Sequence, residues 1–215
     1  GTLEAHYEVV RIAAVVAGPA LPEQWGTKTQ GVDFFDIKAD VLALLALTGT
    51  DDEIRFDVVE HPALQPGQAA AIRRGGEQVG IIGKVHPSVA KSFDIKRAVF
   101  VFEVDADQTL ASEAARAEVI SRFPAIRRDI AVVVPESVTG GQLIDAVKAT
   151  DNALIQDVRI FDIYTGSGIE AGLKSVALGL ILQETSRTLT DDDADSAMAV
   201  AVQKLQHDFG AELRD

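Results

Sequence analysis

The chain contains no cysteine, which excludes disulfide bonds and thiolate catalysis. It also lacks any apolar run approaching the ~20 residues that a membrane-spanning helix requires. Residues 1–4 show neither the basic segment nor the apolar segment that begins a signal peptide. Aromatic residues make up only 6% of the 215 residues. From these absences we expect a cytoplasmic protein without membrane attachment.

Basic residues are also fewer than acidic ones. The chain has 20 Lys and Arg against 33 Asp and Glu, a net charge of −13. Residues 122–215 hold 9 basic and 15 acidic side chains, a balance of −6, which leaves −7 for residues 1–121. Proteins that bind nucleic acid through its phosphates usually present a basic stripe. The composition therefore argues against DNA as a partner, and any RNA contact has to be local or shared with another subunit.

Catalytic and metal-binding motifs are missing as well. The four histidines are too far apart in sequence for a metal-ligand pattern, and no Gly-x-Ser-x-Gly, Walker or Gly-x-Gly-x-x-Gly string occurs. The acidic run at residues 191–195 lacks the spacing and central glycine of a calcium loop and is typical of a helix N-terminus. We expect no catalytic residue, no metal and no cofactor in this chain.

The pattern of residues 1–105 predicts an antiparallel sheet with helices. Residues 8–17 are apolar and β-branched, which is typical of a buried strand, and a helical period begins after Asp33, with Gly49 as its stop. Pro66-Gly67 predicts a turn. The remaining predicted elements are strands at 54–59, 69–73, 77–85 and 98–105, with a hairpin at Gly75-Gly76 and a short helix after Pro87.

Residues 106–121 are polar and rich in Ala and Glu, which indicates a linker. Residues 122–215 then alternate as β-α-β-β-α-β, the ferredoxin-like order. Thr139 and Thr190 each precede a helical pattern and predict N-caps. The predicted strands cover residues 130–134, 154–164, 175–183 and 211–213. The fold class is therefore α+β, with two domains.

Three strings in the second domain carry a resemblance to a known family: residues 121–129 (SRFPAIRRD), 161–166 (FDIYTG) and 187–191 (RTLTD). In this order they resemble the ferredoxin-fold anticodon-binding domain of the β subunit of bacterial phenylalanine–tRNA ligase. Residues 32–41 (VDFFDIKADV) and 80–87 (GIIGKVHP) resemble the same subunit's catalytic-like module. One departure is Gln68, where that family commonly has Arg.

The resemblance implies a partial class II synthetase-like sheet that lacks the catalytic motifs, followed by the anticodon-binding domain. It implies a non-catalytic part of an α2β2 ligase that charges tRNA(Phe) with phenylalanine. The α subunit then holds the active site, and ATP and magnesium serve the whole enzyme rather than this chain. The implied partners are tRNA(Phe) and the α subunit.

The residues of the second domain suit RNA recognition. Strand alternation places Ala131, Ser175 and Ala177 together on one face, as small side chains that let a base approach the backbone. Tyr164 at the border offers a ring for stacking. In the family that is resembled, an aromatic stands at the position of Tyr164, and the positions of Ser175 and Ala131 line the first anticodon base. The cations available for phosphates are Arg127, Arg128, Lys174 and Arg187.

Other readings of the second domain remain open. Ferredoxin-like domains also bind amino acids as regulatory modules, and small residues on a sheet face also mark protein–protein contacts. Tyr164 can equally end a strand with its ring over the core. A purely structural assembly module is therefore the alternative to RNA binding, beside the small-molecule regulatory module.

Overall fold

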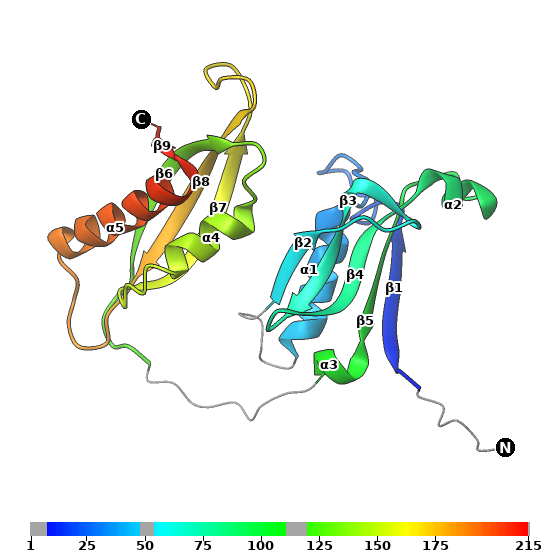
Figure 1. The fold of residues 1–215 in the computed structure, drawn as a ribbon, viewed down its shortest axis with the longest axis horizontal. Helices are drawn as coiled ribbons and strands as arrows, with labels where there is room; N and C mark the ends of the chain where they lie inside the picture. The colour runs from blue at the N-terminus through cyan, green and yellow to red at the C-terminus, as the bar shows by residue number, and fades with distance from the viewer. Residues whose placement is uncertain (1–7, 48–53, 111–119, 215) are drawn as a thin grey trace. The chain divides into compact units, whose positions relative to one another are not determined.

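The computed structural model describes residues 8–47, 54–110 and 120–214. These residues divide into two compact units, each with its own sheet and its own hydrophobic core, and they are described one at a time (Figure 1). Unit 1 holds the described residues up to 110 and unit 2 those from 120 onward. The α+β class is confirmed. The described part of the chain contains no helix long and apolar enough to cross a membrane.

Unit 1 is built on a five-stranded antiparallel sheet with the order β1-β5-β4-β3-β2. The helix α1 packs on one face through its buried residues Ile37, Val41 and Leu45, which meet Phe100 and Phe102 in the core. The elements are β1 (Arg11–Ala17), α1 (Phe34–Ala46), β2 (Ile54–Val58), β3 (Leu64–Arg74), β4 (Glu77–Val85), α2 (Pro87–Ser92), β5 (Val99–Asp105) and α3 (Ala106–Leu110).

The start of α1 follows from its sequence. The Asp33 carboxylate accepts hydrogen bonds from the backbone N–H groups of Phe35 and Asp36, and the Asp36 carboxylate accepts from the Asp33 N–H. This reciprocal capping box satisfies donors that the first helical turn leaves free. The predicted stop at Gly49 lies outside the described residues.

Two predictions for unit 1 are wrong. The strand predicted as buried is β1, which pairs only with β5 among the described strands and leaves Val15 67% exposed. Its outward residues alternate with half-buried ones, as at an edge. Pro66-Gly67 does not end a strand either. It lies within β3, where the pairing with β4 shifts between Leu64 and Ala69 and Gly67 has φ 76°.

Unit 2 is a four-stranded antiparallel sheet with the order β7-β8-β6-β9. The two central strands, β6 and β8, were predicted as the first and third strands of a ferredoxin-like fold, and this order agrees with that prediction. The elements are β6 (Ile126–Pro135), α4 (Gly140–Lys148), β7 (Ile155–Tyr164), β8 (Leu173–Leu182), α5 (Asp191–Phe209) and β9 (Glu212–Leu213). The strand β6 begins four residues before the predicted start.

Both helices of unit 2 lie on the same face of its sheet (Figure 1). Val176, Leu178, Leu180 and Leu182 of β8 point under them and are fully buried or nearly so, as the alternation predicted. The predicted N-caps are confirmed. Thr139 and Thr190 begin α4 and α5, each with a capping box. The opposite face of the sheet is therefore free of both helices.

Candidate functional site

The face of the unit 2 sheet that α4 and α5 do not cover is here called the open face. Its centre consists of small residues, because Ala131 of β6 lies directly opposite Ala177 of β8, and Gly179 lies opposite Asp129. The two alanines, here called the floor, are half-buried, whereas Gly179 is buried beneath the Arg127 and Asp129 side chains. A flat group could approach the sheet at Ala131 and Ala177, and its binding there stays a prediction.

Tyr164 lies at the border of this floor, opposite Ser175 in the pairing of β7 with β8. Its ring packs on Gly166, where a Cβ atom would come within 2.2 Å of the tyrosine oxygen. The Tyr164 hydroxyl donates a hydrogen bond of 3.1 Å to the Ser167 carbonyl oxygen. The Arg214 guanidinium lies 4.9 Å from the ring centroid. The ring is thus held half-buried at the rim, with its hydroxyl already bonded within the chain.

Ser175 is less accessible than predicted. Its register places it on the open face beside Tyr164 and Val133, yet only 4% of the residue is exposed. A ligand meets Ala177 and Ala131, which are both half-buried, before it meets Ser175. Contact with the Ser175 hydroxyl therefore requires the side chains above it to move.

A second aromatic ring stands on the open face. Phe161 is 53% exposed, and the Arg127 guanidinium lies 4.9 Å from its ring centroid. Arg127 belongs to the open face, because a Cβ atom on Gly179 would lie 3.0 Å from its Nε atom. Nε of Arg127 also donates to the Asp129 carboxylate at 2.7 Å. Arg127 is thus the predicted cation that the structure brings to the floor.

Arg128 and Lys174 lie on the other side of the sheet. Arg128 is opposite Leu180, whose side chain is in the core, and its Nη2 atom is 2.5 Å from the Asp191 carboxylate at the start of α5. Lys174 is opposite the buried Val134, and its Nζ atom donates to a backbone carbonyl oxygen, that of Glu136, at 3.0 Å. Neither side chain reaches the floor, and their contacts with RNA stay predictions.

Arg187 is bonded to the first turn of α5 rather than placed on the floor. Its guanidinium donates to both oxygens of Asp193, at 2.5 and 2.9 Å, and Nε lies 3.1 Å from Glu184. The hydrogen bond from Arg187, together with those from Thr190, holds the pKa of the Asp193 carboxyl well below its usual range. The same bond raises the pKa of Arg187. This ion pair organises the N-terminus of α5.

Comparison with known proteins assigns both units. Residues 2–106 match the family described as "Phenylalanyl tRNA synthetase beta chain CLM domain", and residues 121–214 match the "Ferredoxin-fold anticodon binding domain". A relative named phenylalanine–tRNA ligase β subunit, from Methylococcus capsulatus, is 45% identical over 204 residues. The chain belongs to the family of phenylalanine–tRNA ligase β subunits. The resemblance seen in the sequence is confirmed.

Further relatives carry the same name. The β subunits of Pasteurella multocida and Pseudomonas fluorescens are 41% and 40% identical over 204 and 214 residues. The matches cover 95% of this chain for Methylococcus and Pasteurella and 100% for Pseudomonas, but only 26%, 26% and 27% of those relatives. The chain spans about a quarter of the length of the curated relatives it matches. The predicted domain limits, 1–105 and 122–215 with a linker at 106–121, stay predictions.

The sequence pattern did not predict two residues of the open face, Phe161 and Arg214. The sequence pattern gives Phe161 no role, because simple alternation does not place it on the same face as Tyr164. Arg214 follows the strand β9, and its N–H donates to the Ala131 carbonyl oxygen at 2.9 Å. Continuing the alternation of β9 by one residue would have placed Arg214 beside Ala131 on the open face.

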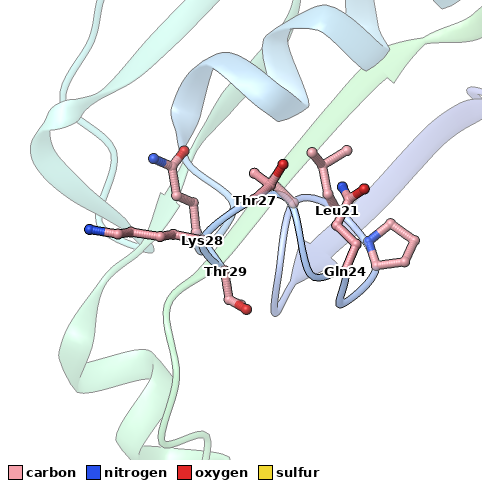
Figure 2. Close-up of a pocket in the computed structure, with 8 residues that line it drawn as sticks. Leu21, Gln24, Thr27, Lys28 and Thr29 are labelled. Carbon is pink, nitrogen blue, oxygen red and sulfur yellow. The ribbon is translucent and has the colours of Figure 1, made fainter.

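Two hollows lie among the described residues of unit 1. The smaller, of about 40 Å³, sits in the loop between β1 and α1 (Figure 2) and is far below the ~300–1,000 Å³ of typical ligand pockets. Its labelled lining residues are Leu21, Gln24, Thr27, Lys28 and Thr29. The larger, of about 350 Å³, contains the ion pair of Arg11 with Glu103. Neither is lined by a predicted site residue. Among the described residues, no group of three or more His, Asp or Glu side chains is arranged to hold a metal ion.

Proposed function

We propose that unit 2 binds the anticodon region of tRNA(Phe) through its open face, within a phenylalanine–tRNA ligase. The observation that carries this proposal is the floor of Ala131 and Ala177 with Tyr164 at its rim, in a domain that matches an anticodon-binding family. Bases in single-stranded loops are recognised by stacking on aromatic rings and by bonds to their edges. The open face offers a ring beside two small side chains, Ala131 and Ala177, that let a base come close to the sheet.

In this proposal the acidic charge of the chain limits how many RNA phosphates it can bind itself. The chain carries −13, so its own contribution to phosphate binding is limited to individual cations. Arg127 and Arg214 stand on the open face next to the two rings. Arg128, Lys174 and Arg187 contact RNA only where it wraps past the edge of the sheet. The remaining phosphate contacts come from other parts of the enzyme.

We propose in addition that unit 1 docks the α subunit of an α2β2 enzyme. Aromatic residues are enriched at protein interfaces, and unit 1 presents a fully exposed Trp25 and a largely exposed Phe93. This chain then contributes no catalytic residue to the charging of tRNA(Phe), and ATP and magnesium act in the rest of the enzyme. The place of action is the cytoplasm. Replacing Trp25 by Ala is expected to weaken α-subunit capture, and unchanged capture argues against this docking site.

The test of the anticodon proposal is a direct binding measurement. The 215-residue chain is titrated with the anticodon stem-loop of tRNA(Phe) and with the same stem-loop carrying a different anticodon. Tighter binding of the first supports anticodon recognition, and equal or absent binding contradicts it. A parallel melting experiment with phenylalanine separates the regulatory alternative, which predicts a raised Tm where RNA recognition predicts none.

A further inference from the structure

The strand β7 contains a bulge that changes which side chains face the RNA-binding side. Ile160 pairs with Leu178, but the next paired residue of β7 is Asp162, opposite Ala177, so that Phe161 is an extra residue. Ile160 points to the helix-covered face, since its Cδ1 atom would lie 2.6 Å from a Cβ atom on Gly140 of α4. Beyond the bulge, Tyr164 faces the open side with Ser175.

Phe161 and Tyr164 are three residues apart, and in a regular strand such residues point to opposite faces. The bulge removes this conflict by adding one residue to one strand. Phe161 meets the open-face Arg127, and Tyr164 meets Arg214, which follows the edge strand β9. Bulges that re-aim a side chain are common beside functional sites. Two aromatic rings, the exposed Phe161 and the half-buried Tyr164, therefore share one face with the floor.

The spacing of the two rings suits two neighbouring bases that are not stacked on each other. Phe161 shares the position opposite Ala177 with Asp162, and Tyr164 lies opposite Ser175, so the two aromatic positions differ by two residues of β8. Two residues of a strand span about 7 Å. Bases stacked on each other lie about 3.4 Å apart. Two bases that each cover one of these rings cannot stack on one another, and each presents its edge to the protein.

We propose that Phe161 is a second base-stacking platform of this face, next to Tyr164, and that it takes the neighbouring base of the same single-stranded loop. Arg127 covers the Phe161 ring in the free chain and turns to an RNA phosphate when a base takes its place. The proposal rests on the proposed function and deepens it. In this proposal the Phe161 ring contacts the RNA, whereas a phenylalanine with a purely structural role would pack into the core.

The experiment uses the 215-residue chain and the anticodon stem-loop with 2-aminopurine placed in turn at the second and third anticodon positions. Fluorescence of this base falls when it stacks on a ring, so each titration reports affinity and the stacking of one base. Phe161→Ala is expected to weaken binding roughly 5- to 150-fold and to restore fluorescence at one position only. Phe161→Tyr, which keeps the ring, is expected to bind as the wild type does.

Two further variants make the result specific. Phe35→Ala removes an exposed phenylalanine of unit 1 and is expected to leave binding unchanged. Phe161→Leu keeps an apolar side chain without a ring, so it separates stacking from folding. Equal affinity of the wild type, Phe161→Ala and Phe161→Leu overturns the proposal, as does fluorescence that no Phe161 variant changes.

Failure of the underlying function gives a different result from failure of the second platform. If the wild-type chain does not bind the stem-loop, the proposed anticodon recognition fails and the Phe161 assignment fails with it. If the wild type binds and Tyr164→Ala weakens binding while Phe161→Ala does not, only the second platform is overturned. If Tyr164→Ala and Phe161→Ala both weaken binding while Phe161→Tyr binds as the wild type does, the result supports anticodon recognition and the second platform.

Discussion

Phe161 and Tyr164 point to the same face of the unit 2 sheet although they lie three positions apart in one strand. The shift of register between Ile160 and Asp162 brings this about. Each ring carries a guanidinium at 4.9 Å, from Arg127 or from Arg214. The two rings border the floor formed by Ala131 and Ala177. This arrangement gives a chain of net charge −13 a local surface suited to bases rather than to phosphates.

Tyr164 gives the most direct substitution test of the open face. Tyr164→Ala is expected to weaken stem-loop binding by about 1–3 kcal/mol, because the stacking surface is lost. Tyr164→Phe is expected to retain most of the affinity, since the hydroxyl donates to the Ser167 carbonyl oxygen within the chain. Isothermal titration of both variants measures this. Equal affinity of the Ala variant and the wild type rules out stacking on this ring.

The positions of the cations predict a difference in salt dependence. Arg127 stands on the open face, whereas Arg187 is bonded to Asp193 at the start of α5. Arg127→Ala is expected to lower the slope of log K against log salt by about 0.7, the value for one contact with a single strand. Arg187→Ala is expected to change the slope less than Arg127→Ala does, because Arg187 is bonded to Asp193 away from the floor. A larger change for Arg187 than for Arg127 contradicts the placement of RNA on this face.

The ion pair of Arg187 with Asp193 predicts a pH dependence of stability. The pKa of Asp193 is lowered in the folded chain, mainly by the hydrogen bond from Arg187, so its carboxylate favours folding at a pH above the unfolded value of about 3.9. This contribution is lost progressively as the pH falls below about 4. Asp193→Asn is therefore expected to be less stable than the wild type at pH 7. Urea unfolding at several pH values checks whether this gap narrows in acid, and a gap independent of pH contradicts the assignment.

Gly80 is predicted to be essential for the packing of unit 1. A Cβ atom at this position would lie 2.4 Å from the Glu103 carbonyl oxygen and 2.7 Å from Val104 Cγ1. Gly80→Ala is expected to cost about 1–3 kcal/mol, as other overpacking substitutions do. Gly26→Ala is the matched control, because its Cβ atom would meet nothing within 4 Å. Denaturant unfolding followed by far-UV circular dichroism compares them, and equal stability of the two contradicts the packing account.

Local signals in the sequence predicted much of the fold. Asp33, Thr139 and Thr190 each combine a capping side chain with an acceptor three residues later, and all three begin helices. The alternation of β8 likewise predicted which residues lie under the helices. These features depend only on residues near each other in sequence.

The errors come from pairing between distant segments. Residues 11–17 are apolar on both sides, which predicts a buried strand, but their place at the edge of the sheet depends on which other strands are present. The bulge at Phe161 is likewise visible only in the pairing of β7 with β8. Arg128 and Arg127 are adjacent in sequence, and only the register shows which of them faces the floor. The direction of these side chains thus depends on strand pairing, which the sequence pattern does not give.

The measurement that tests the central claim most directly is aminoacylation of tRNA(Phe) by a reconstituted phenylalanine–tRNA ligase whose β subunit contains this chain, with and without residues 122–215. The account predicts a large rise in KM for tRNA on deletion, with formation of the aminoacyl-adenylate intact. Unchanged tRNA kinetics after deletion would contradict anticodon recognition by the open face and leave unit 2 as a structural module.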